Sequence, residues 1–191
     1  KPYKELFSVN QYLGIDVKLS GHDHINSDVD FFYDGKKIPF NNNHFDHVFS
    51  SEVVEHVFDI NQFLKEINRV TKMGGNLLLT LPFCVQEHEI PYDFARYSFY
   101  GIKHLLEKNG YKILSFSKTS NNVGTIFQLV AGYISECLLP NNRYLRIVLT
   151  PLFVSPIILI GTLLSRILPS DNKLYLNNVI FCKKVNNLNN N

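Results

Sequence analysis

The chain has few cysteines, and their distribution excludes a disulfide framework. Its 191 residues include three cysteines, Cys84, Cys137 and Cys182, which lie far apart and form no Cys-x-x-Cys pair. An odd and sparse count of this kind is typical of a protein from a reducing compartment.

The chain also has no large excess of charges of one sign. The 19 basic and 17 acidic residues give a net charge of +2, and the basic residues are scattered rather than clustered. A charge this small gives no argument for a nucleic-acid partner. The chain is 45% hydrophobic and 19% charged, both within the globular range, and it is long enough for one domain with a real core.

One segment departs from this mixed pattern, because residues 147–164 contain no charge at all. As a helix these residues would extend about 27 Å, close to the roughly 30 Å of a bilayer's hydrocarbon core. Pro151 and Pro156 predict kinks in such a helix. Three arginines flank it: Arg143, Arg146 and Arg166.

Three interpretations of this apolar segment remain open. It can be a helical hairpin packed on the domain or on a second subunit. It can dip into one leaflet of a membrane and bring the protein to a lipid-linked acceptor. A complete span is the third interpretation, but the last strand must then return to the same sheet on the same side.

Hydrophobic periodicity predicts strands that alternate with helices. Strands are expected at residues 12–17, 27–33, 45–50, 76–81, 111–118 and 178–184. Asp59 is a helix N-cap with Gln62 at capping-box spacing, and Gly74-Gly75 is expected to end that helix. Further helices are expected from Ser98 to Asn109 and over 123–139. The order strand, helix, strand predicts a right-handed crossover in a parallel sheet.

Polar residues follow several of these strands. Open parallel sheets bind ligands beyond the carboxyl ends of their strands. Such ends are expected at Asp16 and at the group that follows the third strand: Ser50, Ser51, Glu52, Glu55 and His56. The pattern therefore favours a ligand site at this edge.

Six short motifs occur in a characteristic order. After Asp16 come Asp-Gly-Lys-Lys-Ile-Pro-Phe at 34–40, Phe-Asp-His-Val at 45–48, Val-Glu-His at 54–56, Glu-Ile-Asn-Arg-Val-Thr-Lys-Met-Gly-Gly at 66–75, and Pro82. Together they resemble class I S-adenosylmethionine-dependent methyltransferases, especially the type 11 group. The resemblance covers roughly residues 1–118 and the last strand.

The resemblance implies a doubly wound, Rossmann-like α/β fold with a mostly parallel sheet and an antiparallel last strand. It predicts a methyltransferase-like domain over 1–185 with an apolar helical insertion at about 123–170, and a disordered tail over 186–191. The family's first strand and glycine-rich loop are not found. We therefore expect that the chain starts just beyond that loop and that a fragment without it binds the cofactor poorly.

The resemblance also assigns cofactor-binding roles. Asp16 would accept hydrogen bonds from the ribose hydroxyls. Asp34 would accept from the adenine amino group, with a turn role and Asp30 as alternatives. Ile38 or Phe40 would flank the adenine ring or simply pack in the core. Backbone atoms of Ser50, Ser51 and Glu52 would lie over S-adenosylmethionine.

Residues 88–98 resemble a subgroup from surface-polysaccharide and cell-envelope gene clusters, which suggests a sugar or glycolipid acceptor. His88 is a candidate general base for an acceptor hydroxyl. Arg96 is a candidate ligand for an anion or a sugar, and Tyr92 belongs to the same polar lid. His56, with Glu55 beside it, is either a second base or a histidine that anchors the helix.

A metal site is not expected. His22-Asp23-His24, with His44 and His47, has the composition of a ligand cluster but not the four ligands at defined spacings of a zinc site. Methyl transfer itself needs no metal, because the sulfonium is already activated.

The sequence thus predicts an enzyme that transfers a methyl group from S-adenosylmethionine to a hydroxyl of a small molecule, a sugar or a lipid-linked acceptor. We expect it to be cytoplasmic, at the inner face of the membrane, without nucleic acid, and with membrane contact or a homodimer through 147–164. One alternative is a truncated or inactive methyltransferase-like domain. Another is a membrane-surface binding module.

Overall fold

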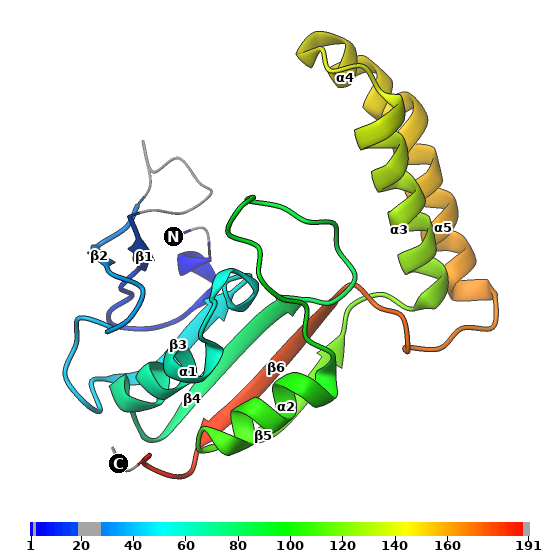
Figure 1. The fold of residues 1–191 in the computed structure, drawn as a ribbon. Helices are drawn as coiled ribbons and strands as arrows, with labels where there is room; N and C mark the ends of the chain where they lie inside the picture. Colours follow the sequence, from blue (N-terminus) through cyan, green and yellow to red (C-terminus); the bar gives the residue numbers. More distant parts are fainter. Residues whose placement is uncertain (2, 19–27, 189–191) are drawn as a thin grey trace. The chain divides into compact units, whose positions relative to one another are not determined.

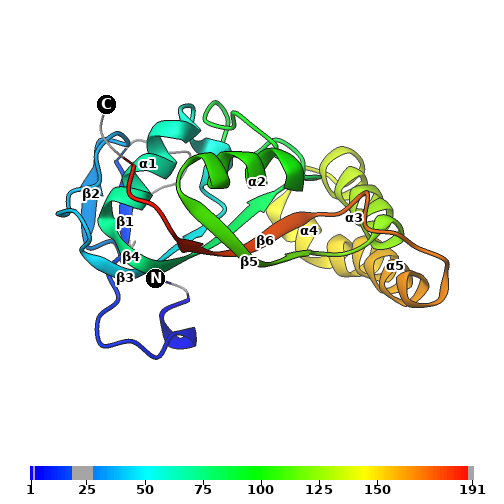
Figure 2. The ribbon, with the colours of Figure 1, turned by 90° about the horizontal axis from the view of Figure 1, so that it is seen from below.

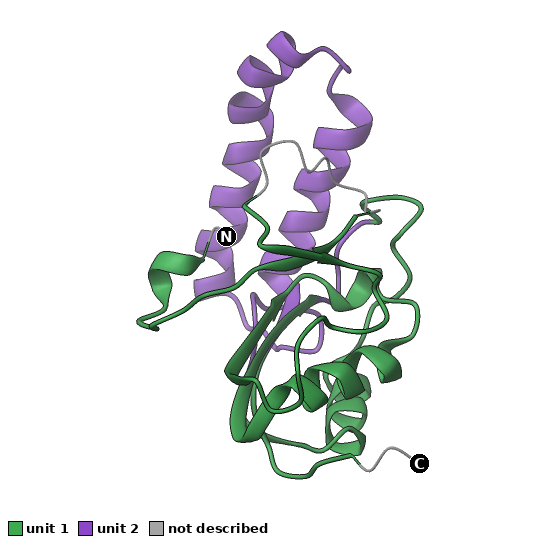
Figure 3. Cartoon of the chain, turned by 90° about the vertical axis from the view of Figure 1, so that its left-hand side faces the viewer, with its two compact units in different colours: residues 1–81, 87–116, 180–191 green, residues 82–86, 117–179 purple. Residues whose placement is uncertain are grey.

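The computed structural model describes residues 1, 3–18 and 28–188. The chain divides into two compact units, coloured separately in Figure 3. Unit 1 comprises residues 1–81, 87–116 and 180–191, and unit 2 comprises residues 82–86 and 117–179. The helical insertion predicted at 123–170 falls within unit 2. The expected cluster at His22-Asp23-His24 lies outside the described residues.

The strands form two sheets (Figure 1). Strands β1 (Ile15–Val17) and β2 (Phe31–Tyr33) pair in parallel with each other. The larger sheet has the order β3-β4-β6-β5. Its strands are β3 (Phe45–Ser51), β4 (Thr71–Pro82), β5 (Tyr111–Lys118) and β6 (Asn177–Lys184). Because β3 and β4 are also parallel, the expected open α/β sheet is confirmed, although it is split in two.

The last strand runs antiparallel to β5, as expected. Val185, just after the end of β6, donates its amide to the carbonyl of Gly110, just before the start of β5. At the opposite ends of the same two strands, Thr119 donates its amide to the carbonyl of Asn177. Pairing of one strand's end with the other strand's start defines an antiparallel ladder.

Two helices of unit 1 share one core with the larger sheet. They are α1 (Ile60–Val70), capped by Asp59 as predicted, and α2 (Phe99–Lys108), capped by Ser98. Both lie on the same face of the sheet (Figure 2). The fully buried core residues of these elements include Leu64, Leu77, Leu79, Leu81, Ile102, Leu106 and Ile180. Alternate residues of β4 enter this core, as strand periodicity requires.

A short N-terminal segment packs on another strand of the sheet. It contains the 3₁₀ turn η1 (Lys4–Leu6). The ring of Tyr3 meets Phe49 of β3 edge to face at 5.3 Å between ring centroids, and Phe7 meets the same ring at 5.4 Å. Aromatic contacts of this geometry hold the segment on β3.

The Gly74-Gly75 pair does not end α1, so that prediction was wrong. The helix ends at Val70, and both glycines lie inside β4. The register shifts there, since Phe45 pairs with Thr71 but His47 pairs with Asn76. Gly74 has φ +78°, and a Cβ on Gly75 would lie 2.6 Å from the carbonyl oxygen of Asp46. A local bulge with close backbone approach therefore requires the glycines.

An ion pair on α1 holds the loop that follows β2. The guanidinium of Arg69 donates to both carboxylate oxygens of Glu66 at 2.8 Å. It also donates to the carbonyl oxygens of Ile38 and Phe40, while Glu66 accepts from the amide of Ile38. The loop carrying Asp34 is thus tied to a helix of the core.

Unit 2 contains a hairpin of two helical arms (Figure 1). The first arm is α3 (Asn122–Tyr133), continued by the π-helical turn η3 (Ile134–Leu138). The second arm joins α4 (Arg143–Leu149), the π-helical turn η4 (Thr150–Val154) and α5 (Ser155–Ile167). Pro151 lies within η4, where its missing amide is accommodated by the wider turn.

The two arms approach closely at a glycine. A Cβ on Gly161 of α5 would lie 2.3 Å from the Cβ of Phe127 on α3. Ala131 of α3 is buried as well. The absence of a side chain at Gly161 thus lets the arms meet at Phe127.

Candidate functional site

The first two strands bring two predicted carboxylates to one neighbourhood. Asp16 lies in β1 opposite Phe32 of β2, and Asp34 follows the end of β2. Burial raises the pKa of Tyr33 to about 12, and the charges of Asp16 and Asp34 add to that rise. The charges of both carboxylates therefore influence the Tyr33 hydroxyl, and both residues lie at the carboxyl ends of two parallel strands.

Asp34 also makes the turn that was its alternative role. Its Oδ1 accepts from the amides of Lys36 and Lys37 at 2.8 and 3.0 Å. These amides hold the pKa of the Asp34 carboxyl below its usual value. Asp30, the competing acid, pairs instead with Lys1 at 2.6 Å and precedes β2. It does not lie at the ligand edge of that strand.

Ile38 belongs to the buried core. It is among the core residues that pack with α1 and β4. The ring of Phe40 meets Phe31 at 5.2 Å and stacks on His44 at 5.1 Å between ring centroids. These contacts favour the packing alternative for both residues over a contact with an adenine ring.

The third strand ends where the sequence predicted a ligand edge. Ser51 pairs with Thr80 of β4, and its Oγ accepts from the Thr80 hydroxyl at 2.9 Å. Ser50 is buried, and its hydroxyl has no hydrogen-bond partner among the described residues. Glu52 turns the chain sharply with φ +50°, and its amide donates to the carbonyl of Thr80. The turn leads into the 3₁₀ helix η2 (Val54–His56).

Helix η2 places Glu55 and His56 against the loop that contains His88. The side chain of Glu55 is 1% exposed, and neither of its carboxylate oxygens has a hydrogen-bond partner among the described residues. Glu55 Oε1 lies 3.7 Å from Nε2 of His56 and 3.8 Å from Nε2 of His88. Burial raises the pKa of Glu55. We call these three residues the Glu-His-His cluster.

The tautomer of His56 is fixed by the backbone of that loop. Nδ1 of His56 lies 2.8 Å from the carbonyl oxygen of Tyr92. A carbonyl oxygen only accepts, so Nδ1 carries the proton and donates it. In the neutral ring Nε2 is then a bare acceptor. It lies 3.7 Å from Oε1 of Glu89 as well as from Glu55.

Asp93 and Arg96 form an ion pair behind His88. Asp93 accepts from both terminal nitrogens of Arg96, and its Oδ2 also accepts from the amide of His88 at 2.9 Å. The Arg96 guanidinium lowers the pKa of Asp93 to about 2. Oδ2 of Asp93 lies 3.6 Å from Nδ1 of His88. Arg96 is thus held beside His88 by the carboxylate of Asp93.

The structure brings His56, His88, Tyr92 and Arg96 together as one site. Sequence reasoning did not identify Glu55 as a buried acid between two histidines. The only signal was its position next to His56 at the end of a predicted strand, since no periodicity reveals that residues 88–96 fold back on η2. The amides of Phe94 and Ala95 make that return by donating to the Glu55 carbonyl at 2.8 and 3.2 Å.

Comparison with known proteins supports the open α/β fold described above. Residues 5–79 match a family model described as a methyltransferase domain. No curated protein matches the chain in sequence. Among solved structures, a complex between the Haloferax volcanii Trm112 methyltransferase activator and a chain described as a methyltransferase is 16% identical, with a TM-score of 0.52. The match covers 82% of this chain and 61% of that one.

Two further structures extend the comparison. The [4+2]-cyclase SpnF is 16% identical over 81% of this chain and 56% of its own, with a TM-score of 0.49. Phosphoethanolamine N-methyltransferase 2 from Haemonchus contortus, in complex with S-adenosyl-L-methionine, is 17% identical over 80% and 36%, with a TM-score of 0.48. This chain spans at most 61% of the length of these three solved chains. Residues 5–79 thus resemble a methyltransferase domain, and the chain shares the open α/β fold of the methyltransferase in the Haloferax volcanii complex.

Proposed function

We propose that unit 1 carries out methyl transfer from S-adenosylmethionine to a hydroxyl of a small molecule, a sugar or a lipid-linked acceptor. The family match over residues 5–79 supports the cofactor. The observation that carries the proposal is the convergence of Asp16 and Asp34 beside Tyr33, at the ends of two paired parallel strands. Carboxylates in that place suit the hydroxyls and the amino group of one nucleoside.

The reaction is a direct displacement at carbon. The acceptor oxygen attacks the methyl carbon while the bond from that carbon to the sulfonium sulfur breaks, and S-adenosylhomocysteine leaves. The hydroxyl proton passes to a base. The protein contributes alignment of the oxygen, carbon and sulfur atoms, and removal of the proton.

The Glu-His-His cluster is the best-placed group to receive that proton. Imidazole nitrogens are common general bases, and Nε2 of each ring lies within 3.8 Å of Glu55 Oε1. Tyr92 and Arg96 lie on the same loop and would contact the acceptor. The resemblance of residues 88–98 to cell-envelope polysaccharide enzymes favours a sugar or glycolipid acceptor.

Calorimetry with S-adenosylhomocysteine tests the cofactor assignment. Asp16→Ala should weaken binding by roughly tenfold or more, since it removes a charge-assisted hydrogen bond to the ribose. The matched control is Asp46→Ala, because Asp46 is an exposed acid near the start of β3 that pairs with Lys72. A measurable wild-type affinity that Asp16→Ala and Asp46→Ala leave equally unchanged contradicts the proposal and favours an inactive domain.

A second function is favoured by the hairpin of unit 2. We propose that it contacts a membrane, so that the protein is peripheral at the cytoplasmic face of the inner membrane. The continuous helix 143–167 is long and apolar enough to cross a bilayer, and 11% of its most apolar window is buried. Ile158, Leu159 and Ile160 are consecutive and all exposed, so apolar side chains cover more than half a turn. Lipid covers such a surface on all sides, whereas a globular partner covers one.

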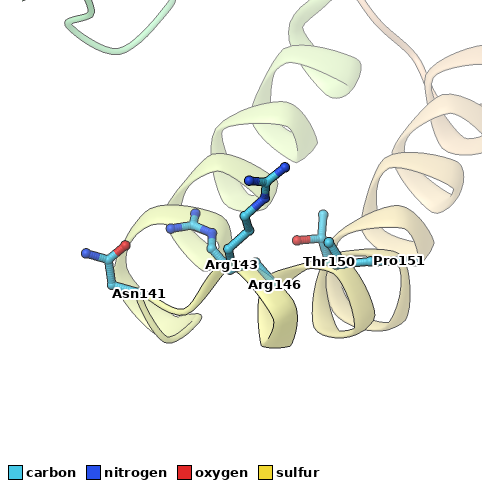
Figure 4. A pocket seen from close by; sticks show the side chains of 6 residues that line it. Asn141, Arg143, Arg146, Thr150 and Pro151 are labelled. Atoms are coloured by element: carbon cyan, nitrogen blue, oxygen red, sulfur yellow. The ribbon is translucent and has the colours of Figure 1, made fainter.

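Two arginines and a glutamate lie near the connecting loop of the hairpin. Arg146 donates to the carbonyl of Ser135 at 2.6 Å and to Glu136 at 3.3 Å, which joins the two arms. Arg143 and Arg146, with Asn141, line a shallow hollow of about 580 Å³ (Figure 4). Between Arg146 and Arg166 no charge occurs, so an apolar stretch of about 30 Å is available for contact with lipid. Because the two arms run in opposite directions, an inserted hairpin returns the chain to the side from which it entered.

Flotation with vesicles tests this second proposal. Wild-type protein should float with phosphatidylcholine vesicles, and more so when phosphatidylglycerol is added, because of the arginines. Leu159→Glu should abolish flotation, while the control Phe58→Glu, an exposed apolar residue of unit 1, should leave it unchanged. If Leu159→Glu instead dissociates a dimer seen by ultracentrifugation and wild-type protein does not float, the apolar surface is covered by a second copy.

A further inference from the structure

We propose that Glu55, His56 and His88 bind a divalent transition-metal cation, which a hydroxyl acceptor would then approach. One ligand atom from each of these residues lies within 4.8 Å of the others. This inference goes beyond the sequence prediction, which expected no metal. The role given to the cation rests on the proposed methyl transfer, but the binding site itself does not.

The cluster contains two acceptors that face each other. Nδ1 of His56 is committed to the Tyr92 carbonyl, so Nε2 of the neutral ring presents a lone pair. That nitrogen is buried and has no hydrogen-bond partner among the described residues, and the same is true of both oxygens of Glu55. Two buried acceptors 3.7 Å apart repel each other unless something positive lies between them. Either a proton or a metal ion can fill that role.

The spacing of the three residues fits a metal ion. With bonds of 2.0–2.2 Å, neighbouring ligands of a tetrahedral cation lie roughly 3.4 Å apart. Glu55 Oε1 is 3.7 Å from Nε2 of His56 and 3.8 Å from Nε2 of His88, so a small contraction of these two distances gives the bonded geometry. The ligand atoms of the two histidines lie within 4.8 Å of each other. The two imidazole rings are perpendicular, with centroids 4.9 Å apart.

The groups behind the ligands are those that support bound metals. Metal-binding histidines usually donate their other ring N–H to a carbonyl or a carboxylate. His56 does so to the Tyr92 carbonyl, while Nδ1 of His88 lies 3.4 Å from Nη2 of Arg96 and 3.6 Å from Oδ2 of Asp93, the carboxylate that could accept its proton. Glu89 Oε1, 3.7 Å from His56 Nε2, is a candidate fourth ligand.

The ligand types select the class of cation. Two imidazoles and a carboxylate suit Zn²⁺, Co²⁺, Mn²⁺ or Fe²⁺, whereas Mg²⁺ and Ca²⁺ prefer oxygen ligands alone. Three protein ligands leave a position for an oxygen of the acceptor. A cation there lowers the pKa of the acceptor hydroxyl, so a solvent-connected group can take the proton and neither histidine need act as the base.

Titration with Co²⁺ tests the site directly, after the full chain has been dialysed against a chelator. We expect one equivalent to bind with the visible absorption of nitrogen and oxygen ligation, to be displaced by Zn²⁺ and to be unaffected by Mg²⁺. His56→Ala and His88→Ala should each weaken binding by roughly tenfold or more, and Asp93→Asn should weaken it less. The control is His104→Ala, an exposed histidine on α2 outside the cluster. Circular dichroism confirms that each variant is folded.

The outcomes separate this inference from the proposed function. If Co²⁺ does not bind, or binds equally to wild type and both histidine variants, the metal site is refuted. If the same samples still bind S-adenosylhomocysteine, the proposed function stands and the cluster acts through a proton. Loss of Co²⁺ binding in the histidine variants, with normal binding by His104→Ala, supports the site even if no methyl acceptor is known.

Discussion

Nδ1 of His56 donates to the carbonyl oxygen of Tyr92, with 2.8 Å between the two atoms. This bond joins η2, at the end of β3, to a loop more than thirty residues further along the chain. The amide of Phe94 makes a second link by donating to the Glu55 carbonyl. The two bonds close the loop over Glu55 and so create its buried position. A contact between distant segments thus sets the tautomer of His56.

Glu55→Gln should stabilise the metal-free protein at neutral pH. Burial raises the pKa of Glu55 in the folded protein above its value in the unfolded chain. Below about pH 4.5 the carboxyl is protonated in both states and imposes no ionisation penalty. As pH rises from there through the folded pKa, ionisation increasingly destabilises the folded protein. The neutral amide avoids that cost. In urea unfolding at pH 7.5 with a chelator present, we expect a gain of about 1–3 kcal/mol that disappears near pH 4.

Glu107→Gln is the control for that measurement, because Glu107 is exposed and pairs only loosely with Lys103 at 3.8 Å. Its stability should match the wild type at both pH values. A Glu55→Gln gain that is the same at pH 4 and pH 7.5 would contradict the ionisation argument.

Arg69→Lys should loosen the loop that carries Asp34. Lysine cannot reproduce the fork that reaches Glu66, Ile38 and Phe40 together. We expect a loss of about 1–3 kcal/mol in the free energy of unfolding and weaker calorimetric binding of S-adenosylhomocysteine. The control is the opposite substitution, Lys65→Arg, at an exposed position on the same helix. It should change neither the free energy of unfolding nor the binding of S-adenosylhomocysteine.

Lys184→Met should destabilise unit 1 although it replaces a charge with an apolar group. Lys184 is buried, and its Nζ donates to the carbonyls of Asn68 and Thr71 at 2.7 and 2.8 Å. Methionine leaves both acceptors unpaired, which costs about 1–3 kcal/mol. Chemical denaturation should show this loss, whereas Lys183→Met, on the exposed side of β6, should be nearly neutral. Equal effects at the two positions would mean that the buried ammonium is not what satisfies the carbonyls.

Gly161→Ala should separate the two arms of the hairpin. Its new Cβ would lie 2.3 Å from Cβ of Phe127, well inside contact distance. Overpacking of this kind costs about 1–3 kcal/mol, and hydrogen exchange of α3 and α5 amides should accelerate accordingly. Gly101→Ala is the control, since its nearest neighbour would be Ser98 Oγ at 3.6 Å and alanine favours the helix. Unchanged exchange in Gly161→Ala would rule out close packing at this glycine.

Much of the fold could be predicted from local patterns. The cap at Asp59 fixed the start of α1, and the predicted strand over 111–118 matches β5. The 12–17 and 27–33 strands were predicted longer than β1 and β2, because apolar runs show where a strand lies better than where it ends. The end of α1 was misplaced because two glycines that fit a helix stop also fit a bulge in β4.

The candidate site was only half predictable. Asp16 and Asp34 follow from strand order, because the carboxyl ends of neighbouring parallel strands always share one edge. His56, His88 and Arg96 were recognised singly as polar residues near that edge.

The amino-acid sequence by itself determined the elements, their order and the polar edge, since these depend on periodicities of a few residues. The tertiary structure alone decided that Glu55 is buried between two histidines and that Lys184 donates to backbone carbonyls of α1 and β4. It also decided that apolar side chains of the hairpin are exposed. Those properties depend on which distant segment covers a residue, and no local pattern encodes that choice.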